Sequence, residues 1–132
     1  GMQALMSHSQ ENGGVDCLDV LPGQVAFFGE AHHSDQGERL KVPHMGWNAV
    51  RPAIAHPLWR GIEPDTRFYF VHSYHVVPDN KAVIAGTFDY GLTGCAALAQ
   101  ENLFATQFHP EKSHTAGLTL LKNFLDWNGT CS

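Results

Sequence analysis

The apolar positions of this 132-residue chain follow helical spacing at both ends and strand-like spacing between them. Near the start, Met2, Leu5 and Met6 recur at i, i+3 and i+4, which places them on one face of a helix. This helix is expected to stop near Asn12-Gly13-Gly14. Near the end, six apolar side chains give a second helix one broad hydrophobic face. They are Leu118, Leu120, Leu121, Phe124, Leu125 and Trp127.

The limits of the second helix are also marked in the sequence. Asn128-Gly129 would end it, because Asn and Gly tolerate the left-handed backbone conformation that closes helices. Ser113 or Thr115 could cap its start by accepting a hydrogen bond from a free backbone N–H.

Between the two helices the chain predicts strands, separated by turns rich in Pro, Gly, Asp and Asn. The expected strands cover 25–28, 41–45, 47–51, 67–76, 82–90, 95–100 and 103–108. The last two would form a hairpin about Glu101-Asn102. A single helical turn is expected within 56–62, and a polar surface loop over 29–39. The order helix, strands, helix predicts one domain of the α/β or α+β class.

The composition fits a folded chain with a hydrophobic core. Hydrophobic residues make up 43% of it and charged residues 16%, which excludes a disordered chain. A net charge of -5 without a basic run argues against nucleic acid and anionic membranes as partners. No apolar stretch approaches the roughly 20 residues that cross a bilayer, and the N-terminus lacks a signal-peptide pattern. We therefore expect a cytoplasmic protein with no nucleic-acid and no membrane partner.

The cysteines and histidines suggest two kinds of chemistry. Cys17, Cys95 and Cys131 are odd in number and form no C-x-x-C pair, which favours reduced thiols over a disulfide framework or a zinc site. Nine histidines raise the hypothesis of a metal site on a strand-rich scaffold. The candidate ligands are His72 and His75, with His44, His109 or His114 from neighbouring strands.

The metal hypothesis is the weaker one. Residues three apart on a strand face opposite sides, which argues against His72 and His75 as a chelating pair. Scattered histidines are more often surface or packing residues than ligands. We therefore expect no metal and no organic cofactor.

The sharpest local motif is His109-Pro110-Glu111. On an extended backbone, residues two apart point to the same side, so Glu111 could accept a hydrogen bond from one imidazole nitrogen of His109. The other nitrogen would stay free as a base. A histidine held by a carboxylate is the base-and-orienter part of a nucleophilic triad. Taken alone, such a pair is more often an incidental surface hydrogen bond.

Five segments, in order along the chain, carry a family resemblance. They are 1–5 (GMQAL), 42–48 (VPHMGWN), 69–74 (YFVHSY), 108–113 (FHPEKS) and 117–124 (GLTLLKNF). Together they resemble the glutaminase subunit of imidazole glycerol phosphate synthase, a class I (triad-type) glutamine amidotransferase. The resemblance implies the C-terminal part of that family's flavodoxin-like three-layer α/β fold, with a mixed sheet, a strand-rich middle and a C-terminal helix.

The resemblance also implies roles for single residues. His109 matches the catalytic base and Glu111 the acid that orients it. The substrate L-glutamine would be held by Gln3, Glu11 and the backbone of His72, Ser73 and Tyr74. The face that docks on a cyclase partner, a (β/α)8 barrel, would include Met45, Trp47, Asn48 and Lys112. The cyclase would use the released ammonia to make imidazole glycerol phosphate in histidine biosynthesis.

One residue of the family pattern is absent. The nucleophilic cysteine of these enzymes sits in G-x-C-x-G-M-Q, and this chain begins at the final Gly-Met-Gln. The matching cysteine would stand two positions before Gly1, and none of the three cysteines present has that context. We therefore expect residues 1–132 to be a single, N-terminally incomplete amidotransferase domain that does not hydrolyse glutamine by itself.

Two further hypotheses follow from the absent cysteine. The chain could instead be a non-catalytic module that keeps only the docking face for its partner. If the first strands of the family fold are absent as well, an unpaired strand edge and an uncovered apolar face would favour a domain-swapped or intertwined homo-oligomer.

Overall fold

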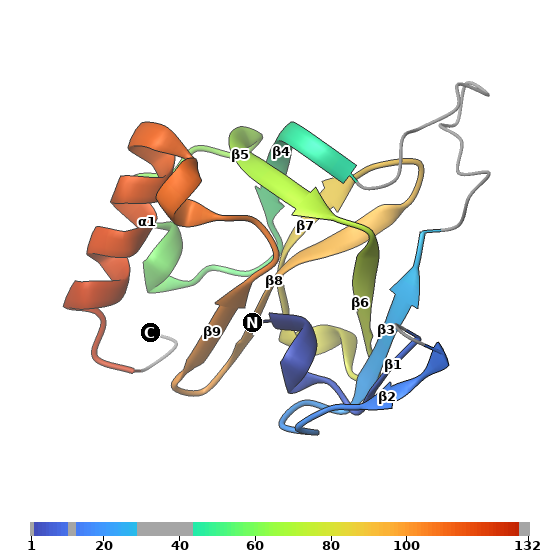
Figure 1. Cartoon of the computed structure of the whole chain (residues 1–132). Helices are drawn as coiled ribbons and strands as arrows, with labels where there is room; N and C mark the ends of the chain where they lie inside the picture. The colour runs from blue at the N-terminus through green and yellow to red at the C-terminus, as the bar shows by residue number, and fades with distance from the viewer. Residues whose placement is uncertain (1, 11–12, 29–43, 130–132) are drawn as a thin grey trace.

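The structure, a computed structural model, describes residues 2–10, 13–28 and 44–129 (Figure 1). Its elements, in order, are η1 (Met2–Leu5), β1 (His8–Ser9), β2 (Val15–Asp16), β3 (Gly23–Phe27), β4 (His44–Pro52), η3 (Pro57–Trp59), β5 (Thr66–His72), β6 (Tyr74–Pro78), η4 (Lys81–Val83), β7 (Ile84–Asp89), β8 (Thr93–Gln100), β9 (Leu103–Thr106), η5 (Pro110–Lys112) and α1 (His114–Asp126). The η elements are short 3-10 helices. Figure 1 shows α1 on one side of the strands and β1, β2 and β3 on the other.

The strands form two sheets, and a single residue separates β5 of one sheet from β6 of the other. The smaller sheet has the order β2-β1-β3-β6, with β1 and β3 parallel and its other pairs antiparallel. The larger sheet has the order β5-β4-β7-β8-β9 and is antiparallel throughout. β5 ends at His72 in the larger sheet, and β6 begins at Tyr74 in the smaller one. Ser73 is therefore the residue at which the chain crosses from the larger sheet to the smaller one, and the chain returns to the larger sheet between β6 and β7.

β8 contributes to both hydrophobic clusters of the structure. Its residues from Gly94 to Ala99 are all buried. Its alanines join the larger cluster, which also contains Phe68 and Phe70 of β5. Cys95 and Leu98 join the smaller cluster, together with side chains of η1, β3 and β6. The strand thus lies between the two cores and connects them.

α1 buries only part of its apolar face. Leu120 is 3% exposed and belongs to the larger core. Four other apolar side chains of the helix are exposed, by 67, 39, 51 and 82% in turn: Leu118, Leu121, Phe124 and Leu125. The single broad hydrophobic face expected from the sequence is therefore divided into a buried and an exposed part.

The first helix expected from the sequence is wrong in its extent. η1 is one 3-10 turn, and β1 begins three residues later. The backbone explains the difference, because Ser7 N–H donates to Gly23 O at 3.0 Å and Gln10 N–H donates to Val25 O at 3.0 Å. Pairing with β3 thus satisfies the groups that a longer helix would have used. The apolar stripe itself marks real burial, since Met2 and Met6 are 4% and 0% exposed.

The hairpin β8–β9, the turn η3 and the helix α1 confirm the predictions made for those segments. Three predictions about strands need correction. The strands expected over 41–45 and 47–51 form one strand, β4, within the described residues, which here begin at 44. The strand expected over 67–76 divides at Ser73. The strand expected over 82–90 begins with η4, because the side chain of Asn80 accepts the N–H of Ala82 at 3.0 Å. The expected loop over 29–39 lies outside the described residues.

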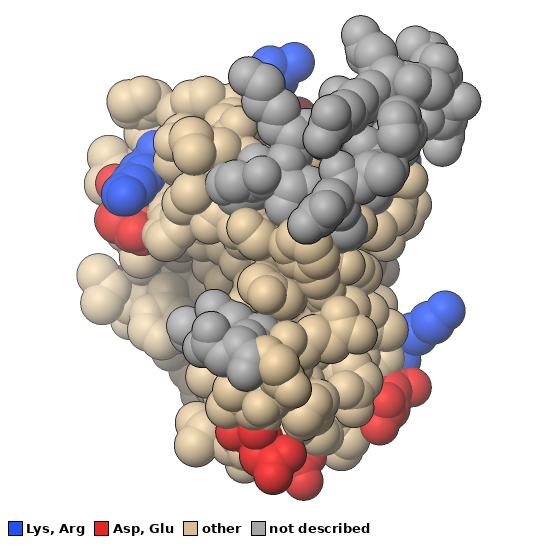
Figure 2. Space-filling view, turned by 45° about the vertical axis from the view of Figure 1, so that its right-hand side comes forward, with Lys and Arg blue, Asp and Glu red and all other residues tan. Residues whose placement is uncertain are grey.

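The described surface carries few charged side chains. In Figure 2 most of the visible face is uncharged, and the Lys and Arg side chains stand apart from one another instead of forming a basic patch on its described part. Among the described residues, no helix has both the length and the apolar character needed to span a bilayer.

Gly117 supplies a test of how α1 packs on η5. A methyl group at Gly117 would overlap the carbonyl oxygen of Pro110. We expect Gly117→Ala to lower the free energy of unfolding by roughly 1–3 kcal/mol through overpacking. Helix propensity alone predicts the opposite sign, a gain of about 1 kcal/mol. Thermal unfolding followed by circular dichroism measures the difference.

The control for this variant is Leu118→Ala, at an exposed neighbouring position of the same helix. It should shift the Tm much less than Gly117→Ala. An unchanged or raised Tm for Gly117→Ala would contradict the close contact between α1 and η5.

Candidate active site

A pocket of about 570 Å³ opens beside the crossing at Ser73. Three segments meet around it, namely η1, the β5–β6 crossing and the stretch from β9 to η5. The lining residues are Met2, Gln3, Val71, His72, Ser73, Tyr74, Thr106, Gln107, Phe108, His109, Pro110 and Glu111. The fold therefore gathers the residues that the sequence assigned to catalysis and glutamine binding, except Glu11, which lies outside the described residues.

His109 and Glu111 form a hydrogen-bonded pair at this pocket. Nδ1 of His109 lies 2.9 Å from Oε1 of Glu111, and the two side chains are 37% and 60% exposed. A hydrogen bond from its own backbone N–H, and then the bond from His109, lower the pKa of the Glu111 carboxyl against the effect of partial burial. The carboxylate accepts, so Nδ1 carries the hydrogen and Nε2 of a neutral ring is left as the acceptor.

The route to this geometry differs from the one expected from the sequence. Glu111 stands on the 3-10 turn η5, and not on an extended strand. Pro110 occupies the first position of that turn, where its missing N–H is not needed. The turn brings the carboxylate back toward the preceding imidazole, so the expected pairing is confirmed and the expected backbone conformation is wrong.

Ser113 holds the turn against the larger sheet. Its hydroxyl donates to His109 O at 2.6 Å and accepts the N–H of Tyr69 at 2.9 Å, and the residue is 1% exposed. His109 N–H in turn donates to Tyr69 O at 2.9 Å. The sequence suggested Ser113 or Thr115 as a helix cap. Ser113 does occupy the N-cap position of α1, but its side chain makes no capping bond, since it is committed to these two partners.

Gln3 joins the N-terminal turn to the far wall of the pocket. Its Nε2 donates to Tyr74 O at 3.2 Å and to Oε1 of Gln107 at 3.0 Å. Both amide hydrogens are thereby used, so Gln3 can present only its oxygen to a ligand. Gln107 is a pocket residue that sequence reasoning missed, although it directly precedes the segment Phe108–Ser113 that carried the resemblance.

The histidines considered as metal ligands have other partners. His44 and His72 are hydrogen-bonded to each other, with Nδ1 of His44 2.8 Å from Nε2 of His72. His114 stacks on Trp47 at 5.1 Å between ring centroids. Among residues 2–10, 13–28 and 44–129, no three His, Cys, Asp or Glu side chains are grouped so that they could hold a metal ion.

Burial sets the protonation of the histidine pair. His44 is 3% and His72 6% exposed. Desolvation, reinforced by the neighbouring His72, lowers the pKa of His44 to about 3. Desolvation also lowers the pKa of His72 to about 4, with His75 and His109 adding to the effect and the bond to Tyr74 opposing it. Both imidazoles are neutral at pH 7.

The residues expected to dock on a partner divide between two faces of β4. Met45 and Trp47 are 62% and 41% exposed and alternate with less exposed positions, so they share the outer face. Asn48 points to the opposite face, where its Nδ2 donates to Asp89 O at 2.8 Å. Lys112 is exposed on η5. The ring of Trp47 stacks on His114, which stands two positions after Lys112 in the chain.

Neither cysteine of the described residues is placed to act with His109. No cysteine is among the residues that line the pocket. Cys95 is 4% exposed, and burial raises the pKa of its thiol to about 12, so it stays protonated. Cys17 is partly buried, and its thiol lies 3.7 Å from Val15 O. Cys131 lies outside the described residues.

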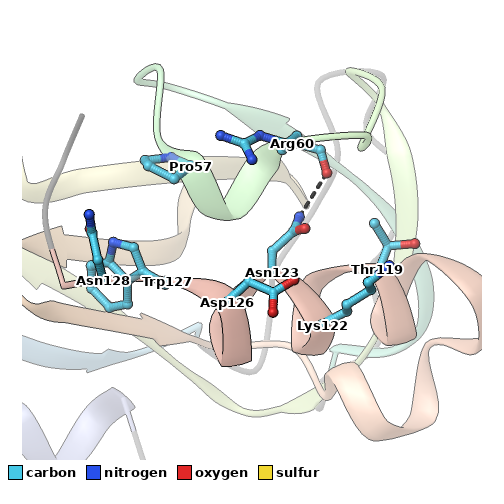
Figure 3. Close-up of a pocket in the computed structure, with 8 residues that line it drawn as sticks. All are labelled: Pro57, Arg60, Thr119, Lys122, Asn123, Asp126, Trp127 and Asn128. Atoms are coloured by element: carbon cyan, nitrogen blue, oxygen red, sulfur yellow. Dashed lines mark hydrogen bonds between the residues drawn. The ribbon is translucent and has the colours of Figure 1, made fainter.

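A second pocket, of about 470 Å³, lies between η3 and α1 (Figure 3). Arg60 and Lys122 are among its lining residues, and Nδ2 of Asn123 ties the two walls together through Arg60 O at 2.7 Å and Leu58 O at 2.9 Å. No histidine or cysteine lines it. It therefore offers no imidazole and no thiol, and the pocket at His109 is the better candidate for catalysis by a histidine base.

The sequence matches the family glutamine amidotransferase class-I over residues 1–127. The chain therefore belongs to the class I glutamine amidotransferase family, which confirms the fold class and the resemblance inferred above. One solved structure with a similar fold is the crystal structure of a putative GMP synthase subunit from Thermoplasma acidophilum. It has a TM-score of 0.57 and 16% sequence identity, over 79% of this chain and 47% of that one.

Closer relatives carry a more specific name. The chain is 57% identical over 129 residues to the imidazole glycerol phosphate synthase subunit HisH of Pseudomonas syringae pv. syringae, which is 98% of this chain and 60% of that protein. It is 58% identical over 129 residues to the subunit of the same name from Acinetobacter baylyi, 97% of this chain and 60% of that protein. The chain thus spans about 60% of the length of these relatives.

The buried histidine pair predicts how stability depends on pH. In the unfolded chain, His44 and His72 take up protons near pH 6.5, whereas in the folded chain they do so only near pH 3 and 4. Between these values the unfolded state binds more protons, so the free energy of unfolding falls as the pH is lowered from 6.5 toward 4. Above pH 6.5 neither state is protonated at these residues, and their contribution is constant. Urea midpoints measured across this range test the prediction.

Carboxylates also titrate at the acid end of the range, so a variant must isolate the imidazoles. His44→Phe removes one of the two rings and its repulsion of the other. Its urea midpoint should fall less steeply between pH 6.5 and 4 than that of the unaltered chain. Equal slopes would show that these histidines do not determine the acid sensitivity.

Proposed function

We propose that the pocket at His109 is the base and substrate-binding half of a glutaminase site, which hydrolyses L-glutamine to glutamate and ammonia. The observation that carries the proposal is the pair His109–Glu111, 2.9 Å apart, at a pocket whose other walls are Gln3 and the crossing at Ser73. The relatives named imidazole glycerol phosphate synthase subunit HisH support the same reaction.

In the proposed mechanism Nε2 of His109 accepts the proton of a cysteine thiol. The sulfur attacks the side-chain carbonyl carbon of glutamine, and His109 returns the proton to the departing ammonia. Water then hydrolyses the thioester and releases glutamate. Glu111 keeps the hydrogen on Nδ1 of His109 and stabilises the imidazolium that forms in each step.

We also propose that the thiol comes from a segment before Gly1, at the position that the pattern G-x-C-x-G-M-Q assigns. Met2 and Gln3 line the same pocket as His109, so the chain already enters the site at its first described residues. The assigned cysteine would stand four positions before Gln3, and four residues reach at most about 14 Å. That distance keeps a thiol in this position within the surroundings of the pocket.

The exposed face of β4 is proposed as the docking surface for a cyclase subunit. Met45 and Trp47 present an apolar surface, and Val71, opposite Met45 on β5, extends it. Contact between Trp47 and His114 links this surface to the chain directly after η5. A partner that displaces the side chain of Trp47 would therefore also displace His114, and with it the adjacent turn η5 that carries Glu111 and follows His109. Lys112 would add a charged contact at the edge of the surface.

The exposed side of α1 supports a further contact. The four exposed apolar side chains of the helix lie along one helix at spacings of three and four residues. We propose that another chain segment or a second copy covers them, in line with the intertwined oligomer expected from the sequence.

Activity is tested with the product of the complete open reading frame that encodes this chain, in the presence of its cyclase. His109→Ala should lower glutamate release by roughly 10²–10⁴-fold, because it removes the general base. Glu111→Ala should lower it less, because the base remains and only its orientation suffers. Glu63→Ala, at an exposed carboxylate outside the pocket, is the matched control and should leave the rate unchanged. A coupled glutamate assay measures all three.

The same assay separates the proposal from its alternative. Residues 1–132 alone should release no glutamate above buffer, with or without the cyclase. Turnover by this chain that disappears in His109→Ala would overturn the claim that its nucleophile lies elsewhere. Cyclase binding without turnover by the complete gene product would instead identify a non-catalytic docking module.

The docking surface is tested by Trp47→Ala. An exposed aromatic side chain at the centre of an interface commonly contributes more than 1–2 kcal/mol, so the dissociation constant for the cyclase should rise about tenfold or more. Leu18→Ala, at an exposed apolar position outside the larger sheet, is the control and should bind normally. Isothermal titration calorimetry gives both constants. Equal affinities would place the interface on another face.

A further inference from the structure

A continuous hydrogen-bond chain runs from the larger sheet to the pocket wall. Nδ2 of Asn48 lies 3.2 Å from Nε2 of His44. Nδ1 of His44 lies 2.8 Å from Nε2 of His72. Nδ1 of His72 lies 2.7 Å from the carbonyl oxygen of Tyr74. The chain begins on β4, passes through β5 and ends on β6, so it spans the crossing at Ser73.

Each group in this chain has one possible role. A carbonyl can only accept, so Nδ1 of His72 carries the hydrogen and Nε2 of the neutral ring accepts. Nδ1 of His44 must then donate, which leaves its Nε2 to accept from the amide of Asn48. The second amide hydrogen of Asn48 goes to Asp89 O at 2.8 Å, and its Oδ1 accepts the N–H of Ala49 at 2.8 Å. The tautomers of both imidazoles are therefore fixed.

Aromatic rings enclose the two imidazoles. Phe70 and Tyr90 stack on His44, at 4.8 and 4.0 Å between ring centroids. Phe28 contacts His72 edge-on at 5.2 Å. This apolar enclosure disfavours an imidazolium and strengthens hydrogen bonds between neutral groups. A missing donor here would leave a buried acceptor unpaired, which is costly.

The end of the chain determines how one wall of the pocket is oriented. The carbonyl of Tyr74 accepts from His72 and also from Gln3 at 3.2 Å, so both of its lone pairs have partners. The preceding carbonyl, of Ser73, accepts the N–H of Phe28 at 3.1 Å. Hydrogen bonds from within the protein therefore hold the carbonyls of both Ser73 and Tyr74, two residues that line the same pocket as His109.

We propose that His44, oriented by Asn48, is a positioning residue of the glutamine pocket: through His72 it fixes the Tyr74 carbonyl and with it the Ser73–Tyr74 wall. Neither His44 nor Asn48 lines the pocket. The proposal rests on the proposed function only for the identity of the ligand. The orientation of the wall is a property of this chain and can be measured without glutamine.

The test compares three variants of the 132-residue chain. His44→Phe fills the aromatic enclosure but removes the donor to His72. His44→Asn restores a donor, because the Asn amide nitrogen takes nearly the place of Nδ1 of histidine. His56→Phe is the matched control, since His56 is also buried, at 6% exposure, and lies outside the pocket lining. Thermal unfolding first identifies which variants are folded.

The first readout is nuclear magnetic resonance of the folded chains without ligand. Imidazole ¹⁵N shifts should show the Nδ1–H form for His44 and His72 in the unaltered chain. In His44→Phe the amide signals of Ser73, Tyr74 and His109 should move, in His44→Asn they should return toward their original positions, and in His56→Phe they should stay. Unmoved signals of Ser73 and Tyr74 in a folded His44→Phe chain would overturn the proposal. If His44→Phe does not fold, Asn48→Ala replaces it, with the same signals deciding the outcome.

The second readout is L-glutamine binding, followed by titration of the same spectra. His44→Phe should raise the dissociation constant about tenfold, the effect of one unpaired buried acceptor, and His44→Asn should recover most of the affinity. Equal affinity of the unaltered and His44→Phe chains would overturn the proposal. If the unaltered chain binds no glutamine while the wall signals move as described, the proposed ligand fails and the positioning role stands.

Discussion

The double burial of β8 is the constraint on which the rest of the structure depends. A strand buried on both faces must be covered on both, and here the residues of β8 pack partly in the larger core, with its aromatic residues, and partly in the smaller core, with side chains of η1, β3 and β6. The carbonyl of Ala96 on this strand also accepts the N–H of Gln107 at 2.8 Å. β8 thus brings the N-terminal turn and the His109 segment to the same end of the molecule.

Two kinds of histidine result from this arrangement. His109 is partly exposed beside a carboxylate, where water and Glu111 can stabilise a positive charge, as a general base requires. His44 and His72 are buried among aromatic rings and held neutral, where they serve as fixed donors and acceptors. The described histidines therefore include residues with opposite electrostatic roles within one fold.

The site could be predicted from sequence where its geometry is local. Only Pro110 separates His109 from Glu111 in the chain, and the motif correctly predicts the hydrogen bond between their side chains. Two other hydrogen bonds join residues far apart in the chain: Ser113 and Tyr69 are 44 positions apart, and His44 and His72 are 28 positions apart. Local residue spacing does not predict such pairs. The predicted length of the first helix was wrong for a similar reason, because Ser7 and Gln10 form hydrogen bonds with β3 in place of the bonds that would extend the helix.

The sequence by itself determined the family, the order of most elements, the buried methionines of the first segment and the pairing of His109 with Glu111. These follow from short motifs and from apolar spacing, which depend on a few neighbouring side chains. Only the tertiary structure decided that the strand expected over 67–76 breaks at Ser73, that Asn48 faces away from Trp47, and that much of the apolar face of α1 stays exposed. The physical reason is that burial and backbone pairing are satisfied between segments far apart in the chain, and their free energy outweighs local preference.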